Sequence, residues 1–133
     1  KNAGKKNMDI KKDIETREDI ERFIRAFYEK VKVDDRIGII FNEIVSINWE
    51  HHIPIITDFW ESILLDNPVY QNNGMEIHYK LHAMYPLNKE HFQAWLSLFE
   101  STLDEMFLGN IAELAKKRAK SVASLMKFKM NIE

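Results

Sequence analysis

The chain has 133 residues, 45% of them hydrophobic, which is enough for one globular domain with one core. Its formal net charge of −2 gives no electrostatic basis for binding nucleic acid, and no apolar run reaches the roughly 18 residues of a membrane span. The chain has no Cys, which excludes disulfides, thiolate metal sites and a Cys nucleophile and fits the reducing cytoplasm, where we expect the protein.

The first twelve residues, KNAGKKNMDIKK, carry five Lys and one Asp and lack an apolar period. We expect residues 1–13 to form a polar flexible leader and residues 14–133 to form a single domain. From there the spacing of apolar residues is helical almost everywhere.

The elements are predicted in this order. A helix runs over 16–33 behind an N-cap at Thr16, and a short helix follows within 34–44. Pro54 starts or bends the next helix, which ends before a loop at 66–74. A short helix follows at 75–84, and a longer one at 89–107 has Asn88 as its N-cap. Asn110 caps the last helix, whose apolar positions from Ile111 to Met126, Leu125 among them, face inward. The sequence therefore predicts an all-α fold.

The expected core is unusually rich in rings. Aromatic walls with a few polar atoms are typical of a pocket for a flat apolar ligand, although composition alone favours an ordinary core. The positions concerned are Phe27, Tyr28, Phe41, His52, Phe59, Trp60, His78, Phe92, Trp95 and Phe99.

Two histidine patterns suggest different chemistry. His78, framed by apolar residues, has the character of an axial ligand to a haem iron, and His52 could face the other side of such a ring. His78 and His82 are four residues apart on one predicted helix, a spacing that can also bind Zn²⁺ or another divalent ion. Zn²⁺ normally takes three or four protein ligands, no third His is near in sequence, and Glu76 lies at a poor angle on the helix, so the metal site is the less favoured interpretation.

Four segments in order resemble the truncated haemoglobins, specifically their third group, over about residues 18 to 126. They are RAFYEKVKVDDRIGIIFNE, NWEHHIPIITDFWESILL, MEIHYKL and EHFQAWLSLFESTLDEMFLGNIAELAKKRA. The resemblance implies a two-on-two helical sandwich, a shortened globin fold.

The resemblance also implies roles for particular residues. The iron ligand falls on His78, or on His82 if the loop before EHFQAW is slipped. The distal residues, on the ligand-binding side of the haem, fall on Tyr28, His52 and Trp95. Phe27, Phe41, Phe59, Trp60 and Trp95 would line the haem pocket.

The implied function is a haem b globin that binds O₂, NO and other diatomic ligands. Nitric oxide dioxygenase or peroxidase-like chemistry would need an external, unidentified reductase, because the chain has no flavin or nicotinamide module; whether the protein is an enzyme stays open. We expect a monomer or weak homo-oligomer. The alternative is a haem-free helical bundle that binds a divalent metal through His78 and His82, or a protein partner.

Overall fold

The computed structural model describes residues 11–44, 48–70 and 87–132. This part of the chain is helical and contains no strand. Its elements are α2 (Arg17–Val33), the short π-helix η1 (Ile40–Ile44), α3 (Trp49–Leu64), α5 (Lys89–Met106) and α6 (Asn110–Lys129). The predicted all-α class is confirmed. The predicted helix over 75–84 lies outside the described residues.

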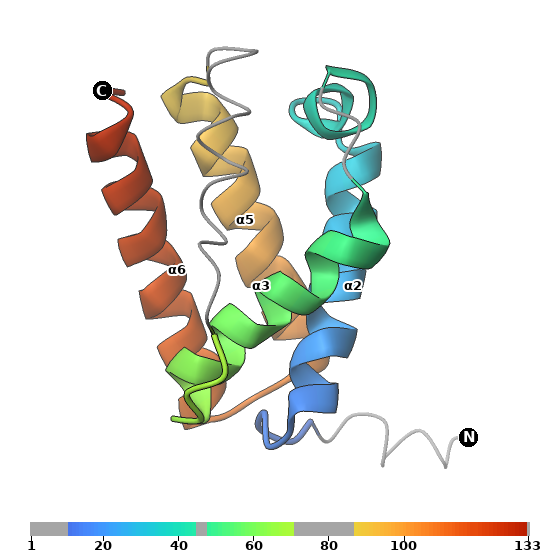
Figure 1. Ribbon diagram of the computed structural model, residues 1–133, viewed down its shortest axis with the longest axis vertical. Helices are drawn as coiled ribbons and strands as arrows, with labels where there is room; N and C mark the ends of the chain where they lie inside the picture. The colour runs from blue at the N-terminus through green and yellow to red at the C-terminus, as the bar shows by residue number, and fades with distance from the viewer. Residues whose placement is uncertain (1–10, 45–47, 71–86, 133) are drawn as a thin grey trace.

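The four long helices form two pairs. Helix α2 packs against α3, and α5 packs against α6; α2 also contacts α5, and α3 contacts α6. In Figure 1, α5 and α6 run side by side, joined by a short connection, while α3 crosses obliquely in front of α2 and α5. The arrangement is the two-on-two helical sandwich that the resemblance implies.

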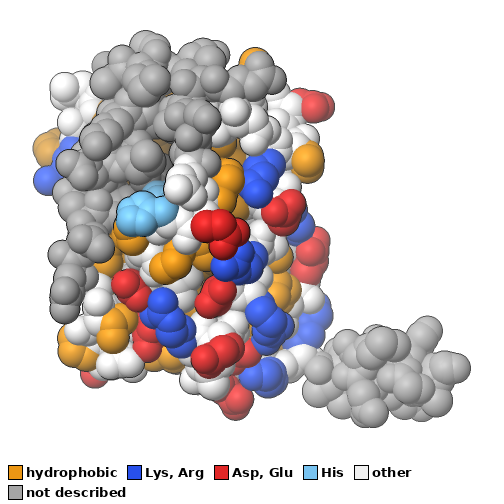
Figure 2. All heavy atoms as spheres, turned by 45° about the vertical axis from the view of Figure 1, so that its right-hand side comes forward, with side chains coloured by type: hydrophobic (Ala, Val, Ile, Leu, Met, Phe, Trp, Pro, Cys, Tyr) orange, Lys and Arg blue, Asp and Glu red, His pale blue; other side chains and the backbone are white. Residues whose placement is uncertain are grey.

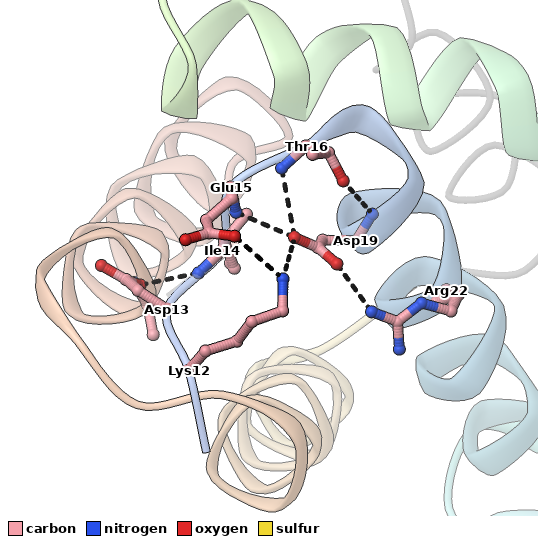
Figure 3. A network of polar contacts seen from close by, with 8 residues as sticks. Lys12, Asp13, Ile14, Glu15, Thr16, Asp19 and Arg22 are labelled. Atoms are coloured by element: carbon pink, nitrogen blue, oxygen red, sulfur yellow. Dashed lines mark hydrogen bonds and ion pairs between the residues drawn. The ribbon is translucent and has the colours of Figure 1, made fainter. Parts of the chain in front are cut away.

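Helix α2 begins with a capping box. The Thr16 hydroxyl accepts from the Asp19 amide, and the Asp19 carboxylate accepts in return from the Thr16 amide (Figure 3). Burial of Asp19 opposes its ionisation, but hydrogen bonds from Lys12, the amides of Glu15 and Thr16, and Arg22 outweigh burial and hold its pKa well below the usual range. The predicted start of this helix is confirmed.

Helix α3 begins earlier than Pro54 indicates. Asn48 is its N-cap, accepting from the His51 amide, and Trp49 is its first residue, so Pro54 lies inside the helix. Pro54 is exposed and so is Glu50, whose carbonyl would otherwise receive the missing hydrogen bond, so water can satisfy that carbonyl. Of the two alternatives at Pro54, the helix start is wrong and a bend stays a prediction.

The start of α6 is capped from across the chain. Gly109, not Asn110, is the N-cap residue and offers no side chain. The Asp13 carboxylate takes its place, accepting from the amides of Ile111 at 2.8 Å and Ala112 at 2.9 Å. The expectation that Asn110 caps the helix is wrong, because a carboxylate distant in sequence already satisfies those amides.

Residues 11–13, assigned to the leader from sequence, bond to the body of the fold. Lys11 Nζ donates to the Asp104 carbonyl at 2.5 Å, and the Lys12 carbonyl accepts from the Leu108 amide at 3.0 Å. Residues 1–10 lie outside the described residues. Within the described chain, no helix is long and apolar enough to cross a membrane.

The core is a single cluster between the two helix pairs. Phe23, Phe27 and Phe99 are among its largest fully buried side chains. Leu125, expected to face inward, is instead 46% exposed, because it lies on the outer side of α6 while Met126 beside it is buried.

Candidate functional site

A group of rings joins α2, the η1 segment and the first turn of α3. Tyr28 contacts Trp49 with ring centroids 4.8 Å apart and His52 at 6.5 Å. Trp49 also lies 6.1 Å from Phe41 and 5.9 Å from His52. Trp49 and His52 can share Tyr28 because residues three apart lie on one helix face.

A second group of rings continues from the first into the core. Phe27 lies 4.6 Å from Tyr28 and 5.6 Å from Trp95, in both cases edge to face. Trp95 stacks on Phe99 with ring centroids 5.3 Å apart, and the ring of Trp60 lies 5.0 Å from that of Phe99. Such pairs stabilise a core by about 0.5–1.5 kcal/mol beyond burial, so these rings are held in place.

Tyr28, His52 and Trp95 are buried in these ring groups and carry polar atoms. Burial raises the pKa of the Tyr28 hydroxyl to about 12, although the nearby Trp95 side chain lowers it somewhat, so the hydroxyl stays protonated at neutral pH. Burial, and then the neighbouring His51, lower the pKa of His52 to about 4, so its imidazole is neutral.

Trp95 holds a donor without a partner. Its side chain is 8% exposed, and among the buried side-chain polar atoms of the described residues its Nε1–H is the one with no hydrogen-bond partner. It lies near the Tyr28 hydroxyl without forming an aligned bond to it. An orphaned buried donor costs about 1–3 kcal/mol, and a polar ligand beside it would remove that cost.

A pocket with an empty volume of about 350 Å³ opens beside Trp95. This space includes volume that is open to solvent, and the cavity within it is about 30 Å³. Its walls come from the segment around η1, the start of α5 and the end of α6. The described residues that line it are Ile37, Ile40, Phe41, Leu87, His91, Phe92, Trp95 and Met126.

The structure brings most of the expected site residues into one connected region. Phe41 and Trp95 line the pocket, Tyr28 and His52 lie on the adjoining ring group, and Phe27 and Trp60 lie behind Trp95 and Phe99. Phe59 is only partly buried, with its ring on Trp60 at 5.4 Å and on Tyr70 at 5.3 Å.

Both expected iron or metal ligands, His78 and His82, lie outside the described residues. Within the described ranges, no group of three or more His, Asp or Glu side chains gathers in a metal-binding arrangement.

Two residues of the region were not assigned to the site from sequence. Trp49 contacts Tyr28, Phe41 and His52, and its spacing of three residues from His52 could have indicated it. His91 lines the pocket and also closes the capping box of α5, where its Nδ1 accepts from the Asn88 amide at 3.1 Å. Its position on the pocket wall follows from the contact of α5 with α6.

Known proteins resemble this chain in sequence and in fold. The sequence pattern of the bacterial-like globins matches residues 12–132. The group 3 truncated haemoglobin ctb of Campylobacter jejuni is 32% identical over 110 residues, which cover 80% of this chain and 84% of that protein. A crystal structure of group III truncated haemoglobin from Campylobacter jejuni superposes with a TM-score of 0.77 at 28% identity, covering 91% of this chain and 95% of that one. The chain therefore belongs to the bacterial-like globins, as a truncated haemoglobin of the third group.

Proposed function

We propose that this globin binds one haem b in the pocket beside Trp95 and uses it to bind O₂ and other diatomic ligands such as NO. Globins hold the haem iron through a histidine, and we assign that ligand to His78, with His82 as the alternative. The observation that carries the proposal is the buried Trp95 Nε1–H, which lacks a partner beside Tyr28 and a ring-lined pocket.

The pocket walls fit a flat, largely apolar macrocycle. Phe41, Phe92 and Trp95 present rings, and Ile40 and Met126 present aliphatic surface. Removing apolar surface from water contributes about 25 cal/mol per Å², so contact with these walls would supply much of the binding energy. We assign Phe27 and Trp60 to the support of the Trp95 side of the pocket, and Phe59 to its outer edge, because Phe59 contacts Trp60 and Tyr70.

A bound haem supplies an iron centre that coordinates O₂, NO or a similar ligand. The chain supplies the polar surroundings of that ligand. The Tyr28 O–H stays protonated and the Trp95 N–H has no competing partner, so both can donate to a ligand with partial negative charge. The neutral His52 can donate from one ring nitrogen or close the site from the α3 side.

The reaction that we propose beyond ligand binding is nitric oxide dioxygenation or peroxide chemistry, in the cytoplasm, with an external protein as reductant. A pocket with two donors holds O₂ firmly, which suits conversion of the ligand better than delivery. We propose a monomer or weak homo-oligomer.

The proposal is tested by a visible spectrum of the protein expressed with haem supplied. We expect a Soret band that shifts when the dithionite-reduced protein meets O₂, that is lost in His78→Ala and that persists in His82→Ala. If the band is lost only in His82→Ala, the iron ligand is His82. If the wild-type protein takes up no haem, the proposal fails and the haem-free helical bundle replaces it.

A further inference from the structure

Positive charge is concentrated on α6. Its twenty residues carry six basic side chains and one acidic side chain, a net charge of +5 on a chain whose total is −2. The rest of the chain therefore carries −7. The basic residues are Lys116, Lys117, Arg118, Lys120, Lys127 and Lys129.

Most of this charge is not neutralised within the fold. On α2 every basic residue forms an ion pair with a carboxylate, and Figure 2 shows both signs interspersed over the face that comes forward. On α6, Lys116 pairs with Asp104 and Glu113, and Lys120 pairs with Glu100. The remaining four basic residues, Lys117, Arg118, Lys127 and Lys129, have no ion pair in the described part of the chain.

Exposed apolar side chains lie among these charges. Phe128 is 79% exposed and Leu125 is 46% exposed, whereas apolar side chains of this size are normally buried. We call Lys117, Arg118, Leu125, Phe128 and Lys129, all of them exposed, the α6 basic face.

The α6 basic face lies across one helix from the proposed haem pocket. Met126 follows Leu125 in the chain but lies on the inner side of α6, where it is buried and lines the pocket. A helix with its side chains is about 10–12 Å across. A protein seated on the outer side of α6 would thus be separated from the pocket by little more than this helix.

We propose that the α6 basic face docks an acidic one-electron carrier protein of the flavodoxin or ferredoxin type, an inference that rests on the proposed haem function. Basic side chains on either side of a small apolar centre along the helix complement an acidic surface and steer association. Electron-transfer contacts are small and transient, so two apolar side chains suffice. In the transfer, the carrier loses one electron and the ferric iron gains it to become ferrous; no bond forms or breaks.

An anionic lipid surface fits these observations less well. Stable binding of a helix at a membrane needs a broad apolar face that is free to enter the lipid. The broad apolar face of α6 is already buried against α5 and the core. Leu125 and Phe128 are the large apolar side chains of α6 that remain exposed and could enter lipid.

The test measures association of the full haem-loaded chain with a purified flavodoxin and with a purified [2Fe–2S] ferredoxin, by calorimetry at low and high ionic strength. We expect at least one carrier to bind at low salt. The triple variant K117Q/R118Q/K129Q should bind it about tenfold more weakly, and high salt should remove the difference. Phe128→Ala should weaken binding at both salt concentrations.

The matched control is R22Q/R25Q/K30Q, which also removes three positive charges, but from α2. This variant should bind the carrier as tightly as the wild type does. Equal weakening of both triple variants, or no binding of either carrier, would overturn the proposal. Binding to phosphatidylglycerol vesicles that depends on the α6 charges, without binding to a carrier, would assign the face to lipid instead. A wild-type Soret band in each variant shows that a loss of binding concerns the face and not the haem function.

Discussion

Replacing Tyr28 with Phe tests the proposed role of its hydroxyl. Tyr28 is 3% exposed, and its ring packs on Phe27 at 4.6 Å and on Trp49 at 4.8 Å. Phe keeps those ring contacts and removes only the O–H, which the raised pKa of about 12 keeps protonated. A hydrogen bond to a charged group contributes about 1.5–3 kcal/mol. At 1.4 kcal/mol for each factor of ten, O₂ should dissociate about 10–100 times faster.

The assay is stopped-flow displacement of O₂ from the ferrous protein by excess carbon monoxide. Tyr70→Phe is the matched control, because Tyr70 packs on Phe59 and not on the ring group around Tyr28; its O₂ dissociation rate should equal that of the wild type. An unchanged rate in Tyr28→Phe would refute the reasoning. An equal acceleration in both variants would show that the effect is not specific to Tyr28.

Three further predictions concern stability. Asp13→Ala should lower the free energy of unfolding in urea by about 1–2 kcal/mol and Asp13→Asn by less, because Asn can still accept from the amides that begin α6; equal stability of Asp13→Ala and wild type would contradict the cross-chain cap. Gly109→Ala should lower the free energy of unfolding by more than about 1 kcal/mol, because the φ of Gly109 is 151° and an added Cβ would meet the Asp13 carboxyl group. In an Asp13→Ala background the clash is removed but the backbone strain remains. Full rescue of stability in that background would contradict the backbone strain. His52 has a pKa of about 4 in the folded protein and 6.5 in the unfolded chain, so the unfolded chain takes up this proton first. The stability that the neutral imidazole contributes is therefore complete above pH 6.5 and is lost as the pH falls towards 4. His52→Gln apoprotein should therefore lose about 2–3 kcal/mol less than the wild type between pH 7 and pH 4, and parallel losses would refute the assignment.

The sequence predicts the parts of the fold that depend on local chemistry. Thr16 and Asn88 each mark a helix start because a capping box is contained within four residues. The start of α6 could not be read in this way, because Asp13 and Ile111 are 98 residues apart and only the folded chain brings them together. The helix start predicted at Pro54 is wrong for a related reason. Trp49 and His52 pack on Tyr28 of another helix, and these contacts stabilise the helical turn that precedes Pro54.

The site residues, too, come together through contacts between segments that are distant in sequence. Tyr28, His52 and Trp95 are spread over three helices, and the ordered resemblance was needed to group them. The structure adds what no sequence pattern gives, which is that the Trp95 donor is buried without a partner. It also places His91 on the wall of the pocket, a position that depends on how α5 meets α6.

The most direct test of the central claim is a crystal structure of the haem-loaded ferric protein. We predict a haem in the pocket beside Trp95, with the imidazole of His78 on the iron and Tyr28, His52 and Trp95 on the opposite face. A haem bound elsewhere on the surface, or Tyr28 and Trp95 on the same side of the ring as the iron-binding histidine, would contradict the proposed function.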